Sequence, residues 1–549
     1  MKKFLFIFLL TSISHAQNFS TVVENLSKEL QNVETGKEEI SQSVSEIEPG
    51  VLQVKITNTS IKNGKVTEES YNFNLSDIDI NTVKAYANKE IIQVQLLVNR
   101  NQKLIKKTTD NQKIGYTDAI NVFADNIDNG RILADLFKSL IPLSAEITEK
   151  RLSLTTFDQH IDWLKENVKN VALQDRNYEQ QVNSNPDYPG RLELTINQST
   201  GKKSNNSVYN FNLANIDPNS LLLEIKGDVS LVSFKTRRKL NTVKYALNGE
   251  QKSYTNNIEI YCENVENARD LQKVLKEASR LSEKIIENTI PKVNSISQGL
   301  SLINEKIKKI IVGENSYDQN FSGECILEFK KQIGNASKSS EEAFFFNLKD
   351  LDPNLTKYDI SSKNVHIELK TKAGKKYLKH LVDDVQKNYH NELILEVGEV
   401  EDAIIIEDIF RQIIQLCENQ EAQYSNSRDA LLQQFIENIH NVVVDKTAFN
   451  QTFEILPDNI FRFKIMEIGE KKSKEKIWEF NAKDINPASI NFETASKKVF
   501  VSINTNYMEK IIKYYEDGII GNYQNNFEIQ ALDIENARQL EQLLRRILQ

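Results

Sequence analysis

The sequence predicts an α+β protein of four tandem modules, each an antiparallel sheet or barrel of six or seven strands with a C-terminal capping helix. Three observations predict this architecture. A stretch of the form aromatic-x-Phe-Asn, followed by an Asn/Asp turn, occurs four times; an apolar-x-Gln-x-apolar motif precedes each copy, and an alternating apolar run that changes to helical spacing follows it. The period far exceeds that of solenoid repeats, so each copy should be a domain with its own core.

The spacing of the repeat excludes chance composition as its origin. Matching turn residues place successive copies 138, 135 and 134 residues apart: Asp79, Asp217, Asp352 and Asn486. Small residues in the helical runs have the same offsets: Gly130, Ala268, Ala403 and Ala537. The glutamines of the preceding motif are Gln42, Gln180, Gln319 and Gln451.

The order of elements is clearest in residues 151–288. A leading amphipathic helix is predicted first, because apolar residues recur at steps of three and four from Phe157 to Val171. A strand at 191–196 alternates apolar and polar residues, and a polar loop at 197–207 separates it from the repeated strand that begins at Tyr209. The leading helix needs an apolar partner, and we expect it to pack on the capping helix of the preceding module.

Four more strands and a helix complete the predicted module. Alternating residues predict a pair of strands at 221–225 and 229–234, and two more around 242–247 and 257–262. The closing helix begins at about Val265 and covers the open face or end of the sheet. Short polar side chains suited to capping stand before three of these helices, and a less suitable glutamate before the fourth: Asn126, Asn264, Asp533 and Glu399.

Six or seven antiparallel strands closed by one C-terminal helix resemble the pleckstrin-homology-like superfold. The resemblance rests on the order of strands and helix in all four modules, without a family motif, and the leading helix is an addition to that pattern. Any other helix-capped antiparallel sheet fits nearly as well. The resemblance implies binding of anionic head groups through the first loop of a module.

The chain divides into a signal peptide at 1–16 and modules at 17–150, 151–288, 289–420 and 421–549. Two lysines precede a short apolar run, and Ser14 and Ala16 supply the small residues that a signal peptidase reads. We therefore expect export, with the periplasm favoured over the cell surface and no membrane-spanning segment after cleavage. A net charge of −8 over 549 residues gives no footprint for nucleic acid. The many Lys, Asn and Ile residues are typical of AT-rich bacterial genomes.

No catalytic constellation stands out, so the sequence predicts a non-enzymatic protein without cofactor or metal. One local cluster carries ligand-type side chains: His380, Asp383, Asp384 and His390. Its spacing matches no zinc pattern, and the region is typical of a polar hairpin. His366 alternates out of phase with its apolar neighbours, so it is expected to face solvent. The carboxylates of the repeated turns are better explained by turn chemistry than by calcium binding.

Two further sets of residues are assigned structural roles. The asparagines that end the repeated strand should bond the backbone of the adjoining turn: Asn74, Asn212, Asn347 and Asn481. Cys262, Cys325 and Cys417 are interpreted as buried apolar positions, with a Cys325–Cys417 bridge left open.

The first loop of each module carries lysines, and those of modules two and four are the candidate anion-binding residues: Lys202, Lys203, Lys471, Lys472, Lys474 and Lys476. The same lysines also serve to keep exposed hairpins soluble and sheet edges unpaired. The preferred hypothesis is an exported binding or scaffold protein of the bacterial envelope that engages protein partners. The alternative is binding of membrane head groups or polyanions through these loops.

Overall fold

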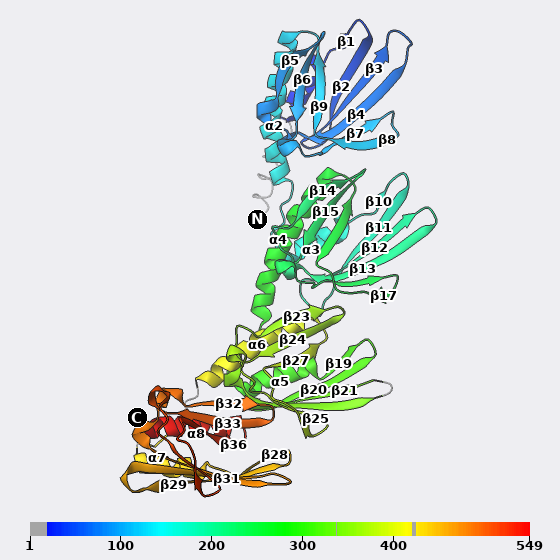
Figure 1. The fold of residues 1–549 in the computed structure, drawn as a ribbon. Coiled ribbons are helices and arrows are strands. Elements are labelled where there is room, and N and C mark those ends of the chain that lie inside the picture. Colours follow the sequence, from blue (N-terminus) through cyan, green and yellow to red (C-terminus); the bar gives the residue numbers. More distant parts are fainter. Residues whose placement is uncertain (1–18, 336–337, 420–423, 426) are drawn as a thin grey trace, which may run out of the picture. The chain divides into compact units, whose positions relative to one another are not determined.

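The computed structural model describes residues 19–335, 338–419, 424–425 and 427–549 (Figure 1). They form two compact units, one that ends at Thr289 and one that runs from Ile290 to Gln549, and each unit contains two of the repeated sheet domains. The α+β class and the fourfold repeat are confirmed. The signal peptide predicted at 1–16 lies outside the described residues. None of the helices in the described part of the chain is long and apolar enough to cross a membrane.

Module one shows the common arrangement. After a helix at residues 19–29, a six-stranded sheet contains β1 (Val33–Glu34), β2 (Glu38–Glu48), β3 (Val51–Ser60), β4 (Val66–Asn74), β7 (Ile105–Thr109) and β8 (Lys113–Thr117), in that order. A three-stranded sheet contains β5 (Lys84–Asn88), β6 (Ile91–Leu97) and β9 (Ala119–Ala124), and α2 (Ile127–Lys150) closes the module. Short helical turns η1 (Leu75–Asp77), η2 (Ile80–Thr82) and η3 (Asn99–Asn101) connect the strands.

The other three modules repeat this order. Module two contains α3 (Phe157–Asn167), β10 (Val171–Ala172), β11 (Arg176–Ser184), β12 (Arg191–Thr200), β13 (Lys203–Asn212), η4 (Leu213–Asn215), β14 (Leu222–Lys226), β15 (Val229–Lys235), η5 (Arg237–Lys239), β16 (Lys244–Leu247), β17 (Glu250–Gln251), β18 (Asn257–Cys262) and α4 (Val265–Thr289). Module three contains α5 (Ile296–Ile307), β19 (Lys309–Val312), β20 (Asn315–Gly323), β21 (Ile326–Gly334), β22 (Ser339–Asn347), η6 (Leu348–Asp350), β23 (Lys357–Ser361), β24 (Asn364–Lys370), η7 (Lys372–Gly374), β25 (Lys379–Val382), β26 (Val385–Gln386), β27 (Glu392–Val397) and α6 (Val400–Glu418). Module four contains α7 (Arg428–Glu437), β28 (Val442–Val444), β29 (Thr447–Leu456), η8 (Pro457–Asn459), β30 (Ile460–Ile468), β31 (Ser473–Asn481), η9 (Ala482–Asp484), η10 (Pro487–Ser489), β32 (Asn491–Ala495), β33 (Lys498–Asn504), η11 (Asn506–Met508), β34 (Lys513–Glu516), β35 (Ile519–Ile520), β36 (Asn526–Ala531) and α8 (Ile534–Leu548).

Each module has more strands than the sequence predicts. Nine strands form an antiparallel sheet of six and another of three, and in the described residues neither sheet closes into a barrel. The expected polar loop at 197–207 is instead a tight hairpin of β12 and β13, which turns at Gly201 with φ of +56°. Polar residues continue both strands because their side chains lie at the exposed end of the hairpin.

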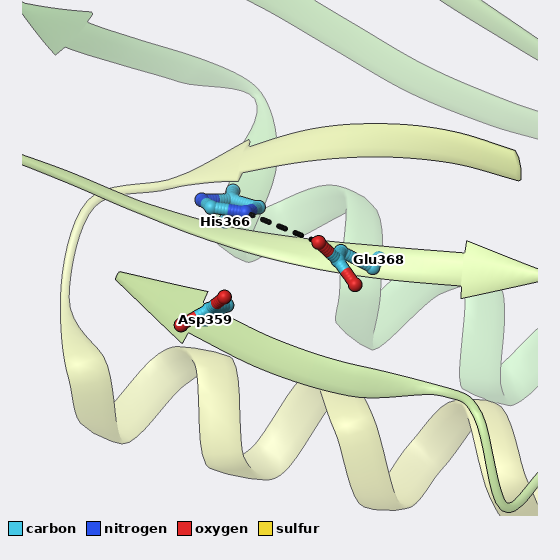
Figure 2. Close-up of side chains that lie close together, drawn as sticks. All are labelled: Asp359, His366 and Glu368. Carbon is cyan, nitrogen blue, oxygen red and sulfur yellow. Dashed lines mark ion pairs between the residues drawn. The ribbon is translucent and has the colours of Figure 1, made fainter. Parts of the chain in front are cut away.

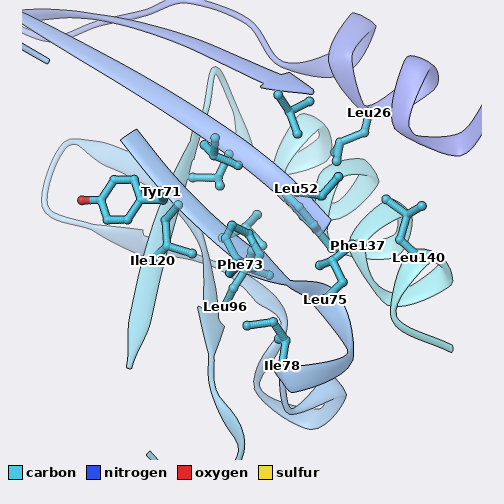
Figure 3. Packing of buried hydrophobic residues seen from close by; sticks show 14 of the residues in the cluster. Leu26, Leu52, Tyr71, Phe73, Leu75, Ile78, Leu96, Ile120, Phe137 and Leu140 are labelled. Atoms are coloured by element: carbon cyan, nitrogen blue, oxygen red, sulfur yellow. The ribbon is translucent and has the colours of Figure 1, made fainter. Parts of the chain in front are cut away.

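The core of each module lies between the two sheets and the closing helix. In module one, Leu52 and Phe73 of the six-stranded sheet, Leu96 of the three-stranded sheet and Phe137 of α2 are all at most 2% exposed (Figure 3). Their convergence explains why the repeated aromatic-x-Phe-Asn strand keeps its phenylalanine in every copy.

A glutamine joins the two sheets in every module, and it is buried in modules two, three and four. The side chain of Gln180 on β11 donates from Nε2 to Tyr261 O at 2.8 Å and accepts from Tyr261 N at 3.0 Å, so it pairs with β18 as a neighbouring strand would. The same reciprocal pair of hydrogen bonds is made by Gln42, Gln319 and Gln451. This explains the glutamine motif, because an unpaired backbone group at this buried edge would be costly.

The leading helix packs within its own module. Helices α3, α5 and α7 contact α4, α6 and α8, respectively, so the expected packing on the preceding module is wrong. In module two, Asn267 Nδ2 of α4 donates to Asn167 O at the end of α3, at 3.1 Å. The helices are also shorter than predicted, because Val171 lies in β10. A short strand carries the last apolar residue of the pattern, and helical spacing alone does not show that the helix has already ended.

The predicted caps and turns are confirmed. Asn126 and Asp533 accept hydrogen bonds from the first turns of α2 and α8, Asn264 accepts from Asn267 N, and Glu399 makes no side-chain cap bond. The strand-ending asparagines accept from the backbone two residues ahead, and the repeated Asp/Asn turn residues do the same. These bonds fix the turn after the repeated strand.

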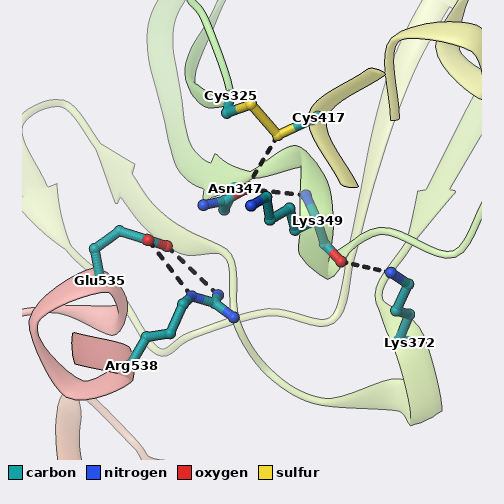
Figure 4. Close-up of a disulfide and its surroundings, with 7 residues drawn as sticks. All are labelled: Cys325, Asn347, Lys349, Lys372, Cys417, Glu535 and Arg538. Atoms are coloured by element: carbon teal, nitrogen blue, oxygen red, sulfur yellow. Dashed lines mark hydrogen bonds and ion pairs between the residues drawn. A yellow bond between two sulfur atoms is a disulfide. The ribbon is translucent and has the colours of Figure 1, made fainter. Parts of the chain in front are cut away.

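A disulfide joins Cys325 and Cys417 in module three, with Cα atoms 5.6 Å apart (Figure 4). The interpretation of these two cysteines as ordinary buried thiols is therefore wrong, whereas Cys262 is buried and free. At the equivalent positions of modules one and two, hydrogen bonds stand where module three has the disulfide. Ser144 Oγ donates to Gly50 O at 2.9 Å, and Ser282 Oγ donates to Asn212 Oδ1 at 3.1 Å.

Candidate docking faces at the module junctions

A buried ion pair joins the modules of unit one. Asp77 ends the η1 turn after the repeated strand of module one, and Arg269 lies in the first turns of α4 in module two. Arg269 Nη2 lies 2.7 and 2.5 Å from the two carboxylate oxygens. The side chains are only 7% and 23% exposed. A charge pair this well buried and this short needs both partners in place.

Further charges surround this pair. Arg151, which follows α2, donates to Glu266 at 2.8 Å and to Asp270 at 2.6 Å, and Asn74 Nδ2 donates to Glu266 at 2.9 Å. Apolar contact adds to the junction, because Val265, Leu223 and Ile225 of module two pack on the core of module one.

Unit two repeats the central ion pair. Arg538 Nη2 in α8 of module four lies 2.6 Å from each carboxylate oxygen of Asp350, which ends the η6 turn of module three. Figure 4 shows Arg538 beside Glu535 of the same helix, with which it also forms an ion pair. Asp350 and Asp77 occupy one position of the repeat, and Arg538 and Arg269 occupy another.

Aromatic packing surrounds the pair in unit two. Tyr377 of module three stacks on Phe492 of module four with ring centroids 4.7 Å apart, and its hydroxyl donates to Phe492 O. Tyr389 of module three is 4% exposed within the core cluster of module four, and its amide donates to Ser496 O. Aromatic contacts therefore surround the ion pair of unit two, where charged residues surround that of unit one.

Burial controls the titration of both pairs. Burial raises the pKa of Asp77 and Asp350 above that of a free carboxyl, and the neighbouring arginine offsets only part of this effect. Burial also acts to lower the pKa of Arg269 and Arg538, but their carboxylate partners outweigh it and raise both values.

The aspartate and the arginine of this ion pair do not occur in every module. Asp occurs at the first position in modules one, three and four, where module two has Asn215. Arg occurs at the second position in modules one, two and four, where module three has Ile404. The sequence alone does not reveal these ion pairs, because the two residues lie 192 positions apart in unit one and 188 positions apart in unit two, and neither belongs to a known motif.

One aspartate and one arginine at these two repeat positions take part in neither junction. Asp484 of module four is half-buried and makes no ion pair with any described residue. Arg131 of module one pairs only with Asp128 of its own helix, and their side chains are 68% and 80% exposed.

Exposed apolar residues follow Asp484 in module four, and one group of them lies on a turn next to it. In the η11 turn, Asn506 Nδ2 donates to Lys483 O at 3.0 Å, which holds this turn beside Asp484. Tyr507 in the same turn is 93% exposed. Exposed large apolar residues between the η11 turn and the segment after β35 are Tyr507, Met508, Ile511, Ile519, Ile520 and Tyr523. We call these six residues, together with Asp484, the module-four face.

The candidate anion-binding lysines lie at hairpin turns. Lys202, Lys203, Lys471 and Lys472 are exposed, in the β12–β13 and β30–β31 hairpins. The remaining two have carboxylate partners: Lys474 lies 2.7 Å from Glu516, and Lys476 lies 3.2 Å from Glu467. These partners reduce the positive field available to an anion.

The predicted ligand-type cluster in module three does not converge on one point. His380 stacks on Phe344 with ring centroids 4.3 Å apart, and His390 packs edge-on against both rings. Asp383 instead accepts from Glu341 N at 3.0 Å, and it lies with Asp384 in the β25–β26 turn. The histidines are part of an aromatic cluster that also contains Phe344.

A different cluster brings Asp359, His366 and Glu368 together on β23 and β24 (Figure 2). The expectation that His366 faces solvent is wrong: it is 8% exposed, because its cross-strand neighbours Asp359 and Glu396 flank it. The donor set suits a divalent cation. Two lysines already compensate the Glu368 carboxylate, Lys370 at 2.9 Å and Lys357 at 3.5 Å, and they lower its pKa despite burial, which raises it.

A pocket of about 580 Å³ lies in module two between α3 and the loop that leads into β12. Phe157, Pro186 and Ile285 form part of its wall.

No protein-family model matches the chain, and no curated protein sequence matches it significantly. The repeat is therefore described from its own four copies.

Proposed function

We propose that this protein is an exported, non-enzymatic binding or scaffold protein of the bacterial envelope, whose module-four face engages a protein partner. One observation carries the proposal. The positions at which Tyr377 and Tyr389 of module three contact module four hold Ile511 and Tyr523 in module four, which are 39% and 50% exposed. A group of exposed large apolar residues close in the chain, with a charge on a neighbouring turn, is typical of a protein interaction site.

Two features support export. A lysine-led apolar segment with small residues before Gln17 is typical of a signal peptide. The Cys325–Cys417 disulfide fits an oxidising compartment such as the periplasm.

The alternative function is binding of membrane head groups or polyanions through hairpin lysines. Lys202, Lys203, Lys471 and Lys472 favour it, because they are exposed at hairpin turns. The carboxylates beside Lys474 and Lys476 weigh against it. We therefore prefer the protein partner.

We also propose that each module is a pleckstrin-homology-like variant with additional strands. Support comes from antiparallel strands followed by one closing helix in every copy. An experimental structure of a module whose strands superpose on that superfold in the same order would establish the relation, and a different order would refute it.

An affinity experiment on residues 17–549 tests the binding function. The wild-type chain, a Tyr507→Ser/Met508→Ser/Tyr523→Ser variant and a matched Lys471→Glu/Lys472→Glu variant are each immobilised and exposed to envelope extract at low and high salt. We expect proteins retained at high salt by the wild type and the lysine variant but lost by the face variant, since apolar contacts resist screening. Retention of lipid alone, at low salt and dependent on the lysines, would support the alternative.

A further inference from the structure

We propose that the partner of the module-four face is module one of a second copy of this chain, so that copies join head to tail. The inference rests on the proposed function of that face and adds the identity of its occupant. It follows from the two junctions inside the chain, which show what this face binds when a partner is present.

Charge complementarity is the first argument. Three modules carry the turn aspartate, and three carry the helix arginine. Asp77 and Asp350 are used with Arg269 and Arg538 in the junctions of the two units. One aspartate, Asp484, and one arginine, Arg131, remain for each chain, and they are the two partners of the same ion pair.

The arginine is already oriented for this contact. Arg269 and Arg538 each pair with the glutamate three residues earlier on the helix, at 3.6 and 3.4 Å, while they hold the aspartate of the preceding module. Arg131 makes the corresponding pair with Asp128 at 2.8 Å. Its side chain therefore lies along the same helix face, at the same step of the repeat.

Apolar complementarity is the second argument. The residue that follows the helix cap is Val265 in module two and Ile534 in module four, and both are buried in the junctions, at 8% and 7% exposed. The equivalent Ile127 of module one is 40% exposed. Ile127 and the module-four face are thus the two halves of a contact that is apolar in both existing junctions.

The geometry implies a heterologous interface. Each chain offers one aspartate face at module four and one arginine face at module one, and these faces differ from each other. Such an interface generates open chains of copies or closed rings, not a twofold dimer.

Charge exchange between variants of the mature chain tests the inference. Asp484→Arg alone places two arginines opposite each other in any such contact, and Arg131→Asp alone places two aspartates opposite each other. Mixing the two variants restores an Asp–Arg pair at every contact, as does the double variant D484R/R131D. Sedimentation velocity over a wide concentration series measures the assemblies, and Lys471→Asp is the control charge reversal.

We expect concentration-dependent assembly of the wild type and of Lys471→Asp, weakened on the order of 100-fold in each single variant and restored in the mixture. Assembly that is unchanged in the single variants would overturn the inference. Restoration in the double variant but not in the mixture would also overturn it, because it would indicate a contact within one chain.

The outcome is separable from that of the binding function. A chain that stays monomeric at every concentration refutes the second copy as occupant. Retention of an envelope protein that depends on Tyr507, Met508 and Tyr523 would still uphold the binding function. Circular dichroism and hydrogen exchange confirm that each variant is folded, which is expected because Arg131 is exposed and Asp484 only half-buried.

Discussion

The junctions of the two units contain equivalent ion pairs, and they differ in the charged or aromatic residues that come from the other module. In unit one, Arg151 extends the Asp77–Arg269 pair into a network of charges. In unit two, Tyr377 and Tyr389 surround the Asp350–Arg538 pair with aromatic contacts. The comparison shows that the repeat fixes the pair, which defines how two modules meet, while the surrounding contacts vary.

A buried ion pair is better suited to fixing how two modules meet than to raising the stability of the protein. Desolvation of both charges consumes most of their attraction, so the net gain in stability is small. A misplaced or missing partner is costly, however, because it leaves a buried charge uncompensated. The pair therefore enforces one relative position of its two modules, whereas apolar contacts alone would tolerate several.

The largest effect is expected from breaking the pair on one side. Arg538→Ala should lower the local stability of α8 by about 3–5 kcal/mol, since it leaves Asp350 buried without its partner. Hydrogen exchange of α8 amides in the full mature chain measures this loss. The control is Arg280→Ala in α4, whose side chain is 52% exposed and pairs with Glu277 of its own helix, with an expected effect on local stability below about 0.5 kcal/mol. Equal effects of the two changes would contradict the importance of the pair.

The next effect concerns the disulfide, which only unit two contains. Replacing both Cys325 and Cys417 by serine should cost unit two about 2–4 kcal/mol, because the bridge closes a long segment of chain. Protection of α6 amides from hydrogen exchange should fall, and that of α4 should not change. Reduction of the wild type with dithiothreitol supplies the control. Equal loss in α4 would show that the effect is not local.

A smaller effect should separate the two junctions by their response to salt. Raising the salt concentration should weaken the charged surroundings of the unit-one junction by about 0.5–1 kcal/mol, because Arg151 is still 21% exposed. Protease cleavage near residue 151 reports the opening of this junction. The Arg151→Met variant should abolish the salt response, and the aromatic junction of unit two should show little of it.

The smallest effect is a pH dependence that His380 gives to unit two. Burial lowers the pKa of His380, and Glu342 opposes this shift while His390 and Lys387 add to it. The stability of the module should therefore be greatest above the ordinary value of 6.5 and fall as the pH drops toward the lowered pKa, since the unfolded chain takes up the proton first. His380→Tyr, which matches Tyr514 of module four, should remove the dependence in thermal unfolding scans. A pH response that persists in this variant would assign it to another group.

The sequence by itself determined the repeat and much of its local structure. The spacing of Asp79, Asp217, Asp352 and Asn486 reveals four modules. Strand alternation, the caps and the strand-ending asparagines also follow from it, because they depend on neighbours a few residues away. The glutamine motif was visible, but its role was not, since its backbone partner lies 77 to 81 residues further along the chain.

Tertiary structure alone decided the contacts between distant segments. The sequence did not show that Asp77 meets Arg269, that Cys325 meets Cys417, or that α3 packs on α4. Nor did alternation reveal that His366 is buried, because the side chains that flank it come from other strands. The physical reason is the same in each case: periodicity reports which face of an element is apolar, whereas the partner of that face depends on how the whole chain folds.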